Sequence, residues 1–284
     1  MDDQVDIDLI TKKADEMFDR SWPGFIHAER RAVPDEATCD LTFPCGLTCT
    51  TNSSPIETEL AYNEIFVRKE YVRSGIDLEE GDTVIDVGAN VGIFTLFLLR
   101  NFRGLTIHAV EPIPVNFRLL ERNVARYGGC ELHLHNTALG SEPDGRIELL
   151  FYPRMTGNST AYPETKRSQR EALSSLFSEE ELGVIYSTEG ITVASTTFSS
   201  LLRKERIGEI ALLKIDTEGS ETDVLRGIEP GDWKRIRQAV IEVHDELKRL
   251  AVVREMLTSH GMRVTVDEQS RDPFGTVVIT AKRG

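Results

Sequence analysis

The stretch Thr83–Thr95 constrains the fold of this chain more than any other part of its sequence. It begins with the apolar and β-branched run TVIDV, which is typical of a buried strand. A sharp turn containing Gly88 and Gly92 follows, and an apolar helical run begins at Ile93. Strand, glycine turn and helix in this order predict the first unit of a nucleotide-binding α/β domain.

The residues of this turn indicate which ligand it binds. A dinucleotide turn needs a second glycine so that the backbone can approach the pyrophosphate, and this chain has Asn90 at that position. The carboxylate of Asp86 at the strand end would also repel phosphate. S-adenosylmethionine (SAM) carries an ammonium and a sulfonium but no phosphate, so an anionic turn favours SAM. We assign to its site Asp86, Gly88, Ala89, Asn90 and Gly92. The alternative is a turn that binds nothing, with Asp86 capping the helix.

The composition excludes several classes of partner. A formal net charge of -14 argues against non-specific nucleic-acid binding, which needs clusters of Lys and Arg. No apolar run approaches the roughly 20 residues that span a bilayer, and the acidic N-terminus lacks the parts of a signal peptide. The four cysteines predict neither a disulfide framework nor a zinc site. We therefore expect a cytoplasmic protein that binds neither nucleic acid nor membrane.

The chain outside the central unit divides into an extension and an insertion. Residues 1–30 have apolar side chains at helical spacing, and residues 38–51 are typical of a β-hairpin. We therefore predict an N-terminal extension over 1–54, acting as a cap or an oligomer contact, and a ligand-binding domain over 55–284. Residues 153–190 are polar and predict a long irregular segment, a lid or a mobile loop.

Strands alternate with helices from about residue 83 to residue 260, which predicts a mostly parallel sheet. Ligands of such sheets bind beyond the carboxyl ends of the strands. A polar residue follows each of five predicted strands, namely Asp86, Glu111, Asn136, Asp216 and His244. Because these strand ends meet at one edge of the sheet, we expect the five side chains to surround one site.

Glu111 ends the second strand, about 20 residues beyond the glycine turn, where a carboxylate can accept bonds from both ribose hydroxyls. The alternative is a surface glutamate before a proline turn. The loop after the third strand borders the adenine in this architecture, although Asn is also a common turn residue. We add to the cofactor site Glu111, Pro112, Asn116, Asn136, Thr137, Ala138 and Asp216.

Asp216 and Glu218 place two carboxylates in one tight turn after the fourth strand. Like charges so close need a compensating group, such as a sulfonium, a protonated substrate group or a metal ion. Capping of the next helix by Asp216, with Glu218 in the first turn, is compatible with this role. We predict that both residues are catalytic.

His244 ends the fifth strand, beside that turn in the expected strand order. An ordinary pKa near 6.5 would let it take a proton from a hydroxyl nucleophile, so we predict it as the catalytic base. Asp216 with Glu242, His244 or Asp245 could also hold a divalent metal ion. We favour a site without metal.

At these residues the chain resembles the FkbM family of SAM-dependent methyltransferases, over about residues 57–282. The motifs are Asp86-x-Gly88-Ala89-Asn90-x-Gly92, Glu111-Pro112, Asn136-x-Ala138-Leu139, Lys214-Ile215-Asp216-x-Glu218-Gly219-x-Glu221 and Ile241-Glu242-Val243-His244. The resemblance implies a class I methyltransferase α/β fold, Rossmann-like, with a mostly parallel seven-stranded sheet and a reversed last strand. It also implies O-methylation of a hydroxyl on a secondary metabolite, a polyketide or peptide intermediate, or a sugar, with S-adenosylhomocysteine as the second product.

Two other functions remain open from the sequence. An NAD-linked oxidoreductase is disfavoured by Asn90 and Asp86, and a non-catalytic interaction module of a larger assembly is disfavoured by the intact motifs. The expected partner is a hydroxylated substrate, either free or bound to a carrier protein. The extension could contact a second copy of the chain, and the resemblance also allows association with a megasynthase.

Overall fold

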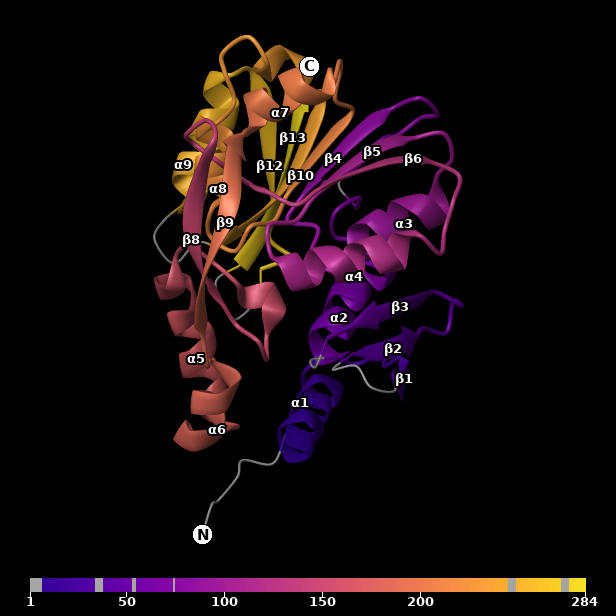
Figure 1. The fold of residues 1–284 in the computed structure, drawn as a ribbon, viewed down its shortest axis with the longest axis vertical. Coiled ribbons are helices and arrows are strands. Elements are labelled where there is room, and N and C mark those ends of the chain that lie inside the picture. The colour runs from indigo at the N-terminus through magenta and orange to yellow at the C-terminus, as the bar shows by residue number, and fades with distance from the viewer. Residues whose placement is uncertain (1–6, 34–37, 53–54, 74, 245–248, 272–275) are drawn as a thin grey trace.

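The computed structural model describes residues 7–33, 38–52, 55–73, 75–244, 249–271 and 276–284. A seven-stranded sheet forms its centre, in the order β12-β13-β11-β10-β4-β5-β6 (Figure 1). The last strand, β13, runs antiparallel to both of its neighbours, and the other six strands are parallel to one another. The predicted fold class, with a reversed last strand, is therefore confirmed. The strands are β4 Thr83–Val87, β5 Thr106–Val110, β6 Glu131–His135, β10 Leu212–Ile215, β11 Gln238–His244, β12 Met262–Asp267 and β13 Thr276–Arg283.

Helices cover both faces of this sheet (Figure 1). Successive residues of a strand point to opposite faces, so Val84 packs with one layer of helices and Ile85 with the other. Both side chains are fully buried. The first layer contains α3 Ile93–Asn101 and α4 Pro114–Val124. The second layer contains α7 Phe198–Glu205, α8 Glu221–Arg226 and α9 Arg249–Ser259, and a 3-10 turn, Trp233–Arg235, lies before β11.

The N-terminal part forms one helix and a small antiparallel sheet. The helix is α1 Ile7–Ser21, and the sheet contains β1 Glu29–Ala32, β2 Cys39–Thr42 and β3 Thr48–Thr51. The hairpin expected over residues 38–51 is present as β2 and β3, whereas β1 has no clear signal in the sequence. Leu41, Phe43 and Leu47 of the hairpin are buried in the same core as α3 and α4.

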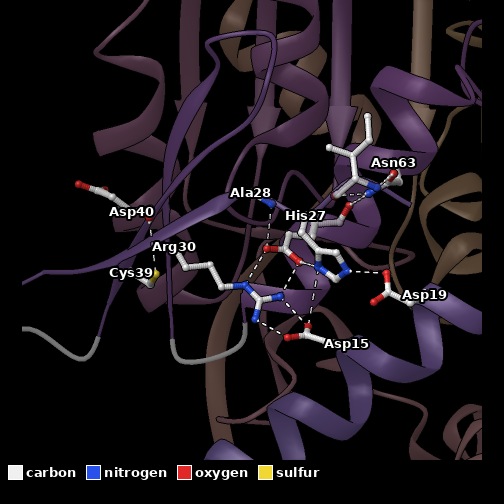
Figure 2. A network of polar contacts seen from close by, with 10 residues as sticks. Asp15, Asp19, His27, Ala28, Arg30, Cys39, Asp40 and Asn63 are labelled. Atoms are coloured by element: carbon white, nitrogen blue, oxygen red, sulfur yellow. Dashed lines mark hydrogen bonds and ion pairs between the residues drawn. The ribbon is translucent and has the colours of Figure 1, made fainter. Parts of the chain in front are cut away.

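A charged network joins α1, β1 and the next helix, α2 Pro55–Tyr62 (Figure 2). The guanidinium of Arg30 donates to Asp15 at 2.7 and 2.9 Å and to Glu59 at 2.6 and 2.7 Å. His27 Nδ1 lies 2.9 Å from Oε2 of the buried Glu59 carboxylate. Although burial opposes it, Glu59 and Asp15 raise the pKa of Arg30. This pairing fixes α1 beside α2.

The helical segment that begins with α2 changes its pitch after Tyr62. After α2 the chain continues as a π-helix, Asn63–Val67. Asn63 Nδ2 donates to the Glu59 carbonyl at 2.7 Å and to the Ile26 carbonyl at 2.9 Å. The widened turn is therefore anchored to the segment that follows α1.

A third sheet has the order β7-β9-β8. Its members are β7 Ala138–Gly140, β8 Gly145–Phe151 and β9 Glu189–Thr197. Ala138 was expected in a loop, and it begins β7 because that short strand pairs with β9. Among the described residues, no helix is long and apolar enough to cross a membrane.

The prediction that residues 153–190 are irregular is wrong. The segment contains the 3-10 turns Thr156–Asn158 and Pro163–Lys166 and the helices α5 Arg167–Leu173 and α6 Glu179–Ile185. Ser178 caps α6 through a capping box with Glu181, a local signal at Ser-x-x-Glu. Leu173, Phe177 and Ile185 are buried against side chains of α1, which explains why the segment is ordered.

Candidate active site

The turn after β4 depends on glycine at its first position. Gly88 has a φ of +78°, and a Cβ there would lie 1.6 Å from the carbonyl oxygen of Asp216. The N–H groups of Gly88 and Ala89 both donate to the carbonyl of Val110 at 3.0 Å. Glycine is required at position 92 for another reason, because a Cβ there would lie 2.7 Å from Leu120 Cδ1 on α4. The glycines therefore let this turn fit against β5, β10 and α4.

Asp86 lies beneath this turn and is fully buried. Its Oδ2 accepts from the hydroxyl of Thr95 at 2.7 Å, and its Oδ1 lies 3.1 Å from Lys214 Nζ. Lys214 also donates to the carbonyl of Gly88 at 2.7 Å. Asp86 and Gly92 line neither of the two cavities described next. Both residues support the turn from behind, and their assignment to the cofactor site stays a prediction.

A cavity at the carboxyl ends of β4, β5 and β10 will be called the turn cavity. Asn90 and Glu111 line it from the turn and β5, and Asp216 lines it from β10. Its wall also contains the predicted residues Gly88, Pro112, Asn116, Thr137, Ala138 and Glu218. The structure therefore brings together, around one cavity, residues from four of the five predicted strand ends.

Glu111 is buried at the rim of β5, where two backbone N–H groups hold its carboxylate. Asn90 donates to Oε2 and Ile113 donates to Oε1, each at 2.8 Å. Burial raises the pKa of Glu111 to about 7, against these hydrogen bonds. Asn136 lies behind it and donates through Nδ2 to the carbonyls of Glu111 and Pro112 at 2.8 and 3.1 Å. Asn136 thus positions the strand end and does not line the cavity.

Three polar atoms in the wall of the turn cavity have no hydrogen-bond partner among the described residues. They are Asn90 Oδ1, Asn116 Oδ1 and Thr217 Oγ1, and all three are buried. A buried polar atom without a partner costs about 1–3 kcal/mol. A ligand that donates hydrogen bonds would remove this cost.

A second and larger cavity, the large cavity, adjoins the first. Its walls come from α1, α2, α5 and the ends of β10 and β11. The residues that line both cavities are Gly88, Asn90, Gly157, Asp216 and Glu218. The turn and the Asp216–Glu218 segment therefore form the junction between two binding spaces, and Ala89 faces the large one.

Asp216 shares a polar cluster with Lys214 of its own segment and with residues from two other segments. The hydroxyl of Tyr71 lies 2.5 Å from Glu242 Oε2 and 3.1 Å from Asp216 Oδ2, and Lys214 Nζ lies 3.5 Å from Asp216 Oδ2. Burial raises the pKa of Asp216. Burial and then the neighbouring Asp216 raise the pKa of Glu242 to about 8. Both carboxyl groups can therefore exchange a proton nearer neutral pH than an exposed carboxyl group does.

His244 lies between two carboxylates. Its Nε2 is 2.9 Å from Glu218 Oε2, and its Nδ1 is 3.2 Å from Glu221 Oε1. Against the effect of burial, Glu218 raises the pKa of His244 well above its ordinary value. The predicted base needs a free ring nitrogen and a pKa near 6.5, and neither condition is met here. An imidazolium with two carboxylate partners corrects that interpretation.

The insertion reaches the same junction. Lys166 forms an ion pair with Glu218, and the hydroxyl of Thr160 donates to the Glu218 carbonyl at 2.6 Å. Although burial opposes it, Lys166 and then His244 lower the pKa of Glu218 to about 2. Glu218 is thus a permanent anion that connects the insertion to β11 and is unsuited to accept a proton.

The possible metal set does not converge in the described part of the chain. Asp245 lies outside the described residues. Among those described, at least three metal-ligating side chains meet within 4.8 Å only at Asp15, His27 and Glu59. Arg30 already pairs with both of those carboxylates.

Sequence reasoning missed Tyr71, Lys166 and Glu57. Their segments lie far along the chain from the strand-end motifs, and no local pattern marks them. Lys214 did carry a signal, because a lysine inside the apolar run ALLKI must find a buried anion. The paired anion is Asp86, which is itself a charged residue inside an apolar strand.

Comparisons with known proteins agree with this geometry. The family model described as "Methyltransferase FkbM domain" matches residues 86–264. The 31-O-demethyl-FK506 methyltransferase FkbM of Streptomyces tacrolimicus is 36% identical over 222 residues, which cover 75% of this chain and 84% of that protein. Methyltransferase 1 of Beauveria bassiana is 32% identical, over 78% of this chain and 87% of that protein.

A third relative is much longer than this chain. AMB antimetabolite synthetase AmbE of Pseudomonas aeruginosa is 29% identical over 273 residues, which cover 89% of this chain but only 13% of AmbE. The family match spans most of the sheet and both cavity-lining turns. The resemblance read from the motifs is therefore confirmed, and the chain belongs to the FkbM methyltransferase family.

Proposed function

We propose that this methyltransferase transfers the methyl group of SAM to a hydroxyl group of an organic acceptor. The observation that carries the proposal is the junction between the two cavities. Gly88, Asn90, Asp216 and Glu218 line both spaces, so a cofactor in the turn cavity and an acceptor in the large cavity would meet there. Holding the two reactants in line is the main source of catalysis for such a transfer.

The turn cavity suits SAM by the chemistry of its wall. Asn90 Oδ1, Asn116 Oδ1 and Thr217 Oγ1 are buried there without partners among the described residues. SAM offers donors for such atoms in its ammonium, its ribose hydroxyls and its adenine amino group. The carboxylate of Glu111 is presented on the same wall and retains lone pairs for the two ribose hydroxyls.

The same wall disfavours the NAD-linked alternative. Three carboxyl side chains line the cavity, those of Glu111, Asp216 and Glu218, and none of the described residues that line it is Lys or Arg. A pyrophosphate would therefore meet negative charge with no compensating cation. A cationic sulfonium would be stabilised by these carboxylates.

Asp216 is the base that the geometry favours. When bound, SAM supplies an electrophilic methyl group on its sulfonium. The carboxylate of Asp216 takes the proton of the acceptor hydroxyl, because it lines both cavities and its pKa is raised by burial. Tyr71 and Lys214 hold this carboxylate in place through its Oδ2. A raised pKa brings a base closer to the operating pH and makes proton transfer more favourable.

His244 and Glu218 then position the site and do not exchange protons. The imidazolium of His244 bridges Glu218 and Glu221, and Lys166 adds a second cation to Glu218. This arrangement fixes the turn that carries Asp216 and brings the insertion over the junction. We therefore propose that residues 153–190 act as a lid by forming an ordered wall of the large cavity.

The names of two relatives support a finer proposal on the acceptor. One relative is a 31-O-demethyl-FK506 methyltransferase, a name that indicates methylation of an oxygen of an organic compound. AmbE is named a synthetase, and this chain matches a small part of it. We propose a hydroxylated secondary metabolite as the acceptor, with a carrier-bound intermediate as the alternative.

Calorimetric titration with S-adenosylhomocysteine, SAM and NAD⁺ tests the cofactor. We expect the first two to bind and NAD⁺ not to bind. Transfer of labelled methyl from SAM to a panel of hydroxylated compounds, including 31-O-demethyl-FK506, tests the reaction. Binding of NAD⁺ without binding of S-adenosylhomocysteine would refute the proposal.

A further inference from the structure

A third cavity lies between α1 and the two helices of the insertion, and its wall is mostly apolar. We call it the apolar annex, and the side chains that define it are Ile10, Ala14, Leu173, Phe177, Val184 and Ile185. None of the functions described so far uses it. An apolar cavity of this kind favours apolar ligands, because water inside it has few partners.

The apolar annex adjoins the large cavity along a shared wall. Met17, Phe18, Leu60, Met155 and Leu173 line both spaces. Two of these five residues are methionines, whose unbranched side chains adapt to irregular ligands. The annex is therefore next to the large cavity, which in turn reaches the junction at Asp216.

Glu57 is the charged residue of this shared wall, and the structure reduces the effect of its charge. Its carboxyl group accepts hydrogen bonds from the backbone of Thr156 and Gly157. Burial and then the neighbouring Glu218 raise its pKa to about 8. A neutral Glu57 at pH 7 adds no negative charge to this shared wall.

The walls of the annex are held together independently of any ligand. Lys13 of α1 forms an ion pair of 2.6 Å with Glu181 of α6, and Lys13 Nζ also lies 5.8 Å from the ring centre of Phe177. Leu173, Phe177, Leu182 and Ile185 form a buried cluster against α1. The annex is therefore a space inside a packed contact and not an open gap between loosely placed helices.

We propose that the apolar annex binds the aliphatic part of the acceptor whose hydroxyl lies at the junction. The acceptor would be amphipathic, with a polar end near Asp216 and a hydrocarbon chain or ring system between α1 and α5. A free sugar would leave the annex empty. This inference rests on the proposed function, because it assumes that the large cavity receives the acceptor.

A series of straight-chain primary alcohols, from 1-butanol to 1-decanol, tests the inference by calorimetry with and without saturating S-adenosylhomocysteine. We expect the Kd to fall by about threefold to fourfold for each added methylene group, as burial of hydrocarbon predicts. Ala14→Trp fills the annex, since Ala14 lines only this cavity. In that variant the gain should stop at the shorter alcohols while the Kd of 1-butanol stays the same.

The matched control is Lys12→Trp, which adds the same side chain on the exposed face of α1 and should keep the full dependence on chain length. Ile10→Asp is a second variant of the annex, to be used if Ala14→Trp does not fold. It should raise the Kd of 1-decanol at least tenfold. An equal slope in wild type, Ala14→Trp and Ile10→Asp would overturn the inference. So would a change of oligomeric state in the annex variants without any change in alcohol binding, because the annex would then be a contact between copies.

The two proposals fail separately. If wild-type protein did not bind S-adenosylhomocysteine, the proposed function would be refuted, whereas the slope of the alcohol series would still test the annex. If S-adenosylhomocysteine binds normally and the alcohols show no dependence on chain length, only the annex inference is lost.

Discussion

Gly88 approaches Asp216 so closely that a Cβ atom on the glycine would lie 1.6 Å from the carbonyl oxygen of the aspartate. The turn after β4 and the turn after β10 are therefore packed backbone against backbone. One of them lines the proposed cofactor site and the other carries the proposed base. Their contact fixes the distance between cofactor and acceptor without any bound ligand.

Gly88→Ala should destabilise the fold and abolish binding of S-adenosylhomocysteine. The added Cβ overlaps backbone atoms, which have no other rotamer to adopt, and the φ of +78° is also strained for alanine. We expect a loss of about 1–3 kcal/mol in the free energy of unfolding, measured in urea. Gly81→Ala is the control, because Gly81 has a φ of +91° but no neighbour within 4 Å. Equal losses in the two variants would refute the role of the contact.

Lys214→Met should cost about 3–5 kcal/mol, because it leaves the carboxylate of Asp86 buried without its cation. Adding Asp86→Asn should recover part of that loss, since no buried charge would then remain on this pair. Urea unfolding of the two single variants and the double variant gives the coupling energy. Lys204→Met, at an exposed position, should change stability by less than about 0.5 kcal/mol. Additive losses in the double variant would contradict the pairing.

The succession of central strands along the chain could be predicted because each strand repeats a clear local pattern. The run TVIDV is apolar, ends in a turn and is followed by a helix, and the later units behave in the same way. The segment 153–190 could not be predicted by this logic. Its helices α5 and α6 are short, and their order depends on packing against α1, which is more than 130 residues away along the chain.

The candidate site likewise contains residues that could be predicted from the sequence and features that could not. Glu111 and Asp216 were identified because their position at the end of a strand determines where they lie. The protonation of His244 could not be predicted, since it depends on Glu218 and Glu221 facing its two nitrogens. Tyr71 reaches Asp216 only because of the path of the chain after the π-helix, and no local pattern encodes that path.

Binding of S-adenosylhomocysteine should strengthen as pH rises through about 7, the pKa of Glu111 in the free protein. The ionised carboxylate accepts the ribose hydroxyls better than the protonated form does, so affinity is lost below that pH. Glu111→Gln should weaken binding about tenfold to a hundredfold and remove this dependence on pH. Titration calorimetry from pH 5.5 to pH 8.5 measures both effects. The control Glu142→Gln, at an exposed loop position, should bind as the wild type does. A pH dependence of binding that persists in Glu111→Gln would exclude Glu111 as the residue that binds the ribose.

The pH–rate profile distinguishes Asp216 from His244 as the base. With an acceptor from the panel, Asp216→Asn should lower kcat at least about a hundredfold and eliminate the loss of rate at low pH. His244→Asn should keep that acidic limb, because the imidazolium does not exchange the proton. Calorimetry should show that S-adenosylhomocysteine still binds to His244→Asn. If His244→Asn loses the acidic limb and Asp216→Asn retains it, the roles are reversed.

The free energy of unfolding should decrease as pH rises from about 5 to about 8, and Glu242→Gln should reduce this decrease. Glu242 has a pKa of about 8 in the folded protein and an ordinary value of 4.5 when unfolded, so between these values the folded state binds more protons. Stability then falls with rising pH, and the loss is complete above the folded pKa. Glutamine stays neutral and keeps an oxygen for Tyr71. Glu57 and Glu111 have raised pKa values as well, so part of the slope should remain.

Urea unfolding at pH 5, 6, 7, 8 and 9 gives the slope, with the exposed Glu255→Gln as the control. A slope in Glu242→Gln equal to that of Glu255→Gln would show that Glu242 is already ionised in the folded protein.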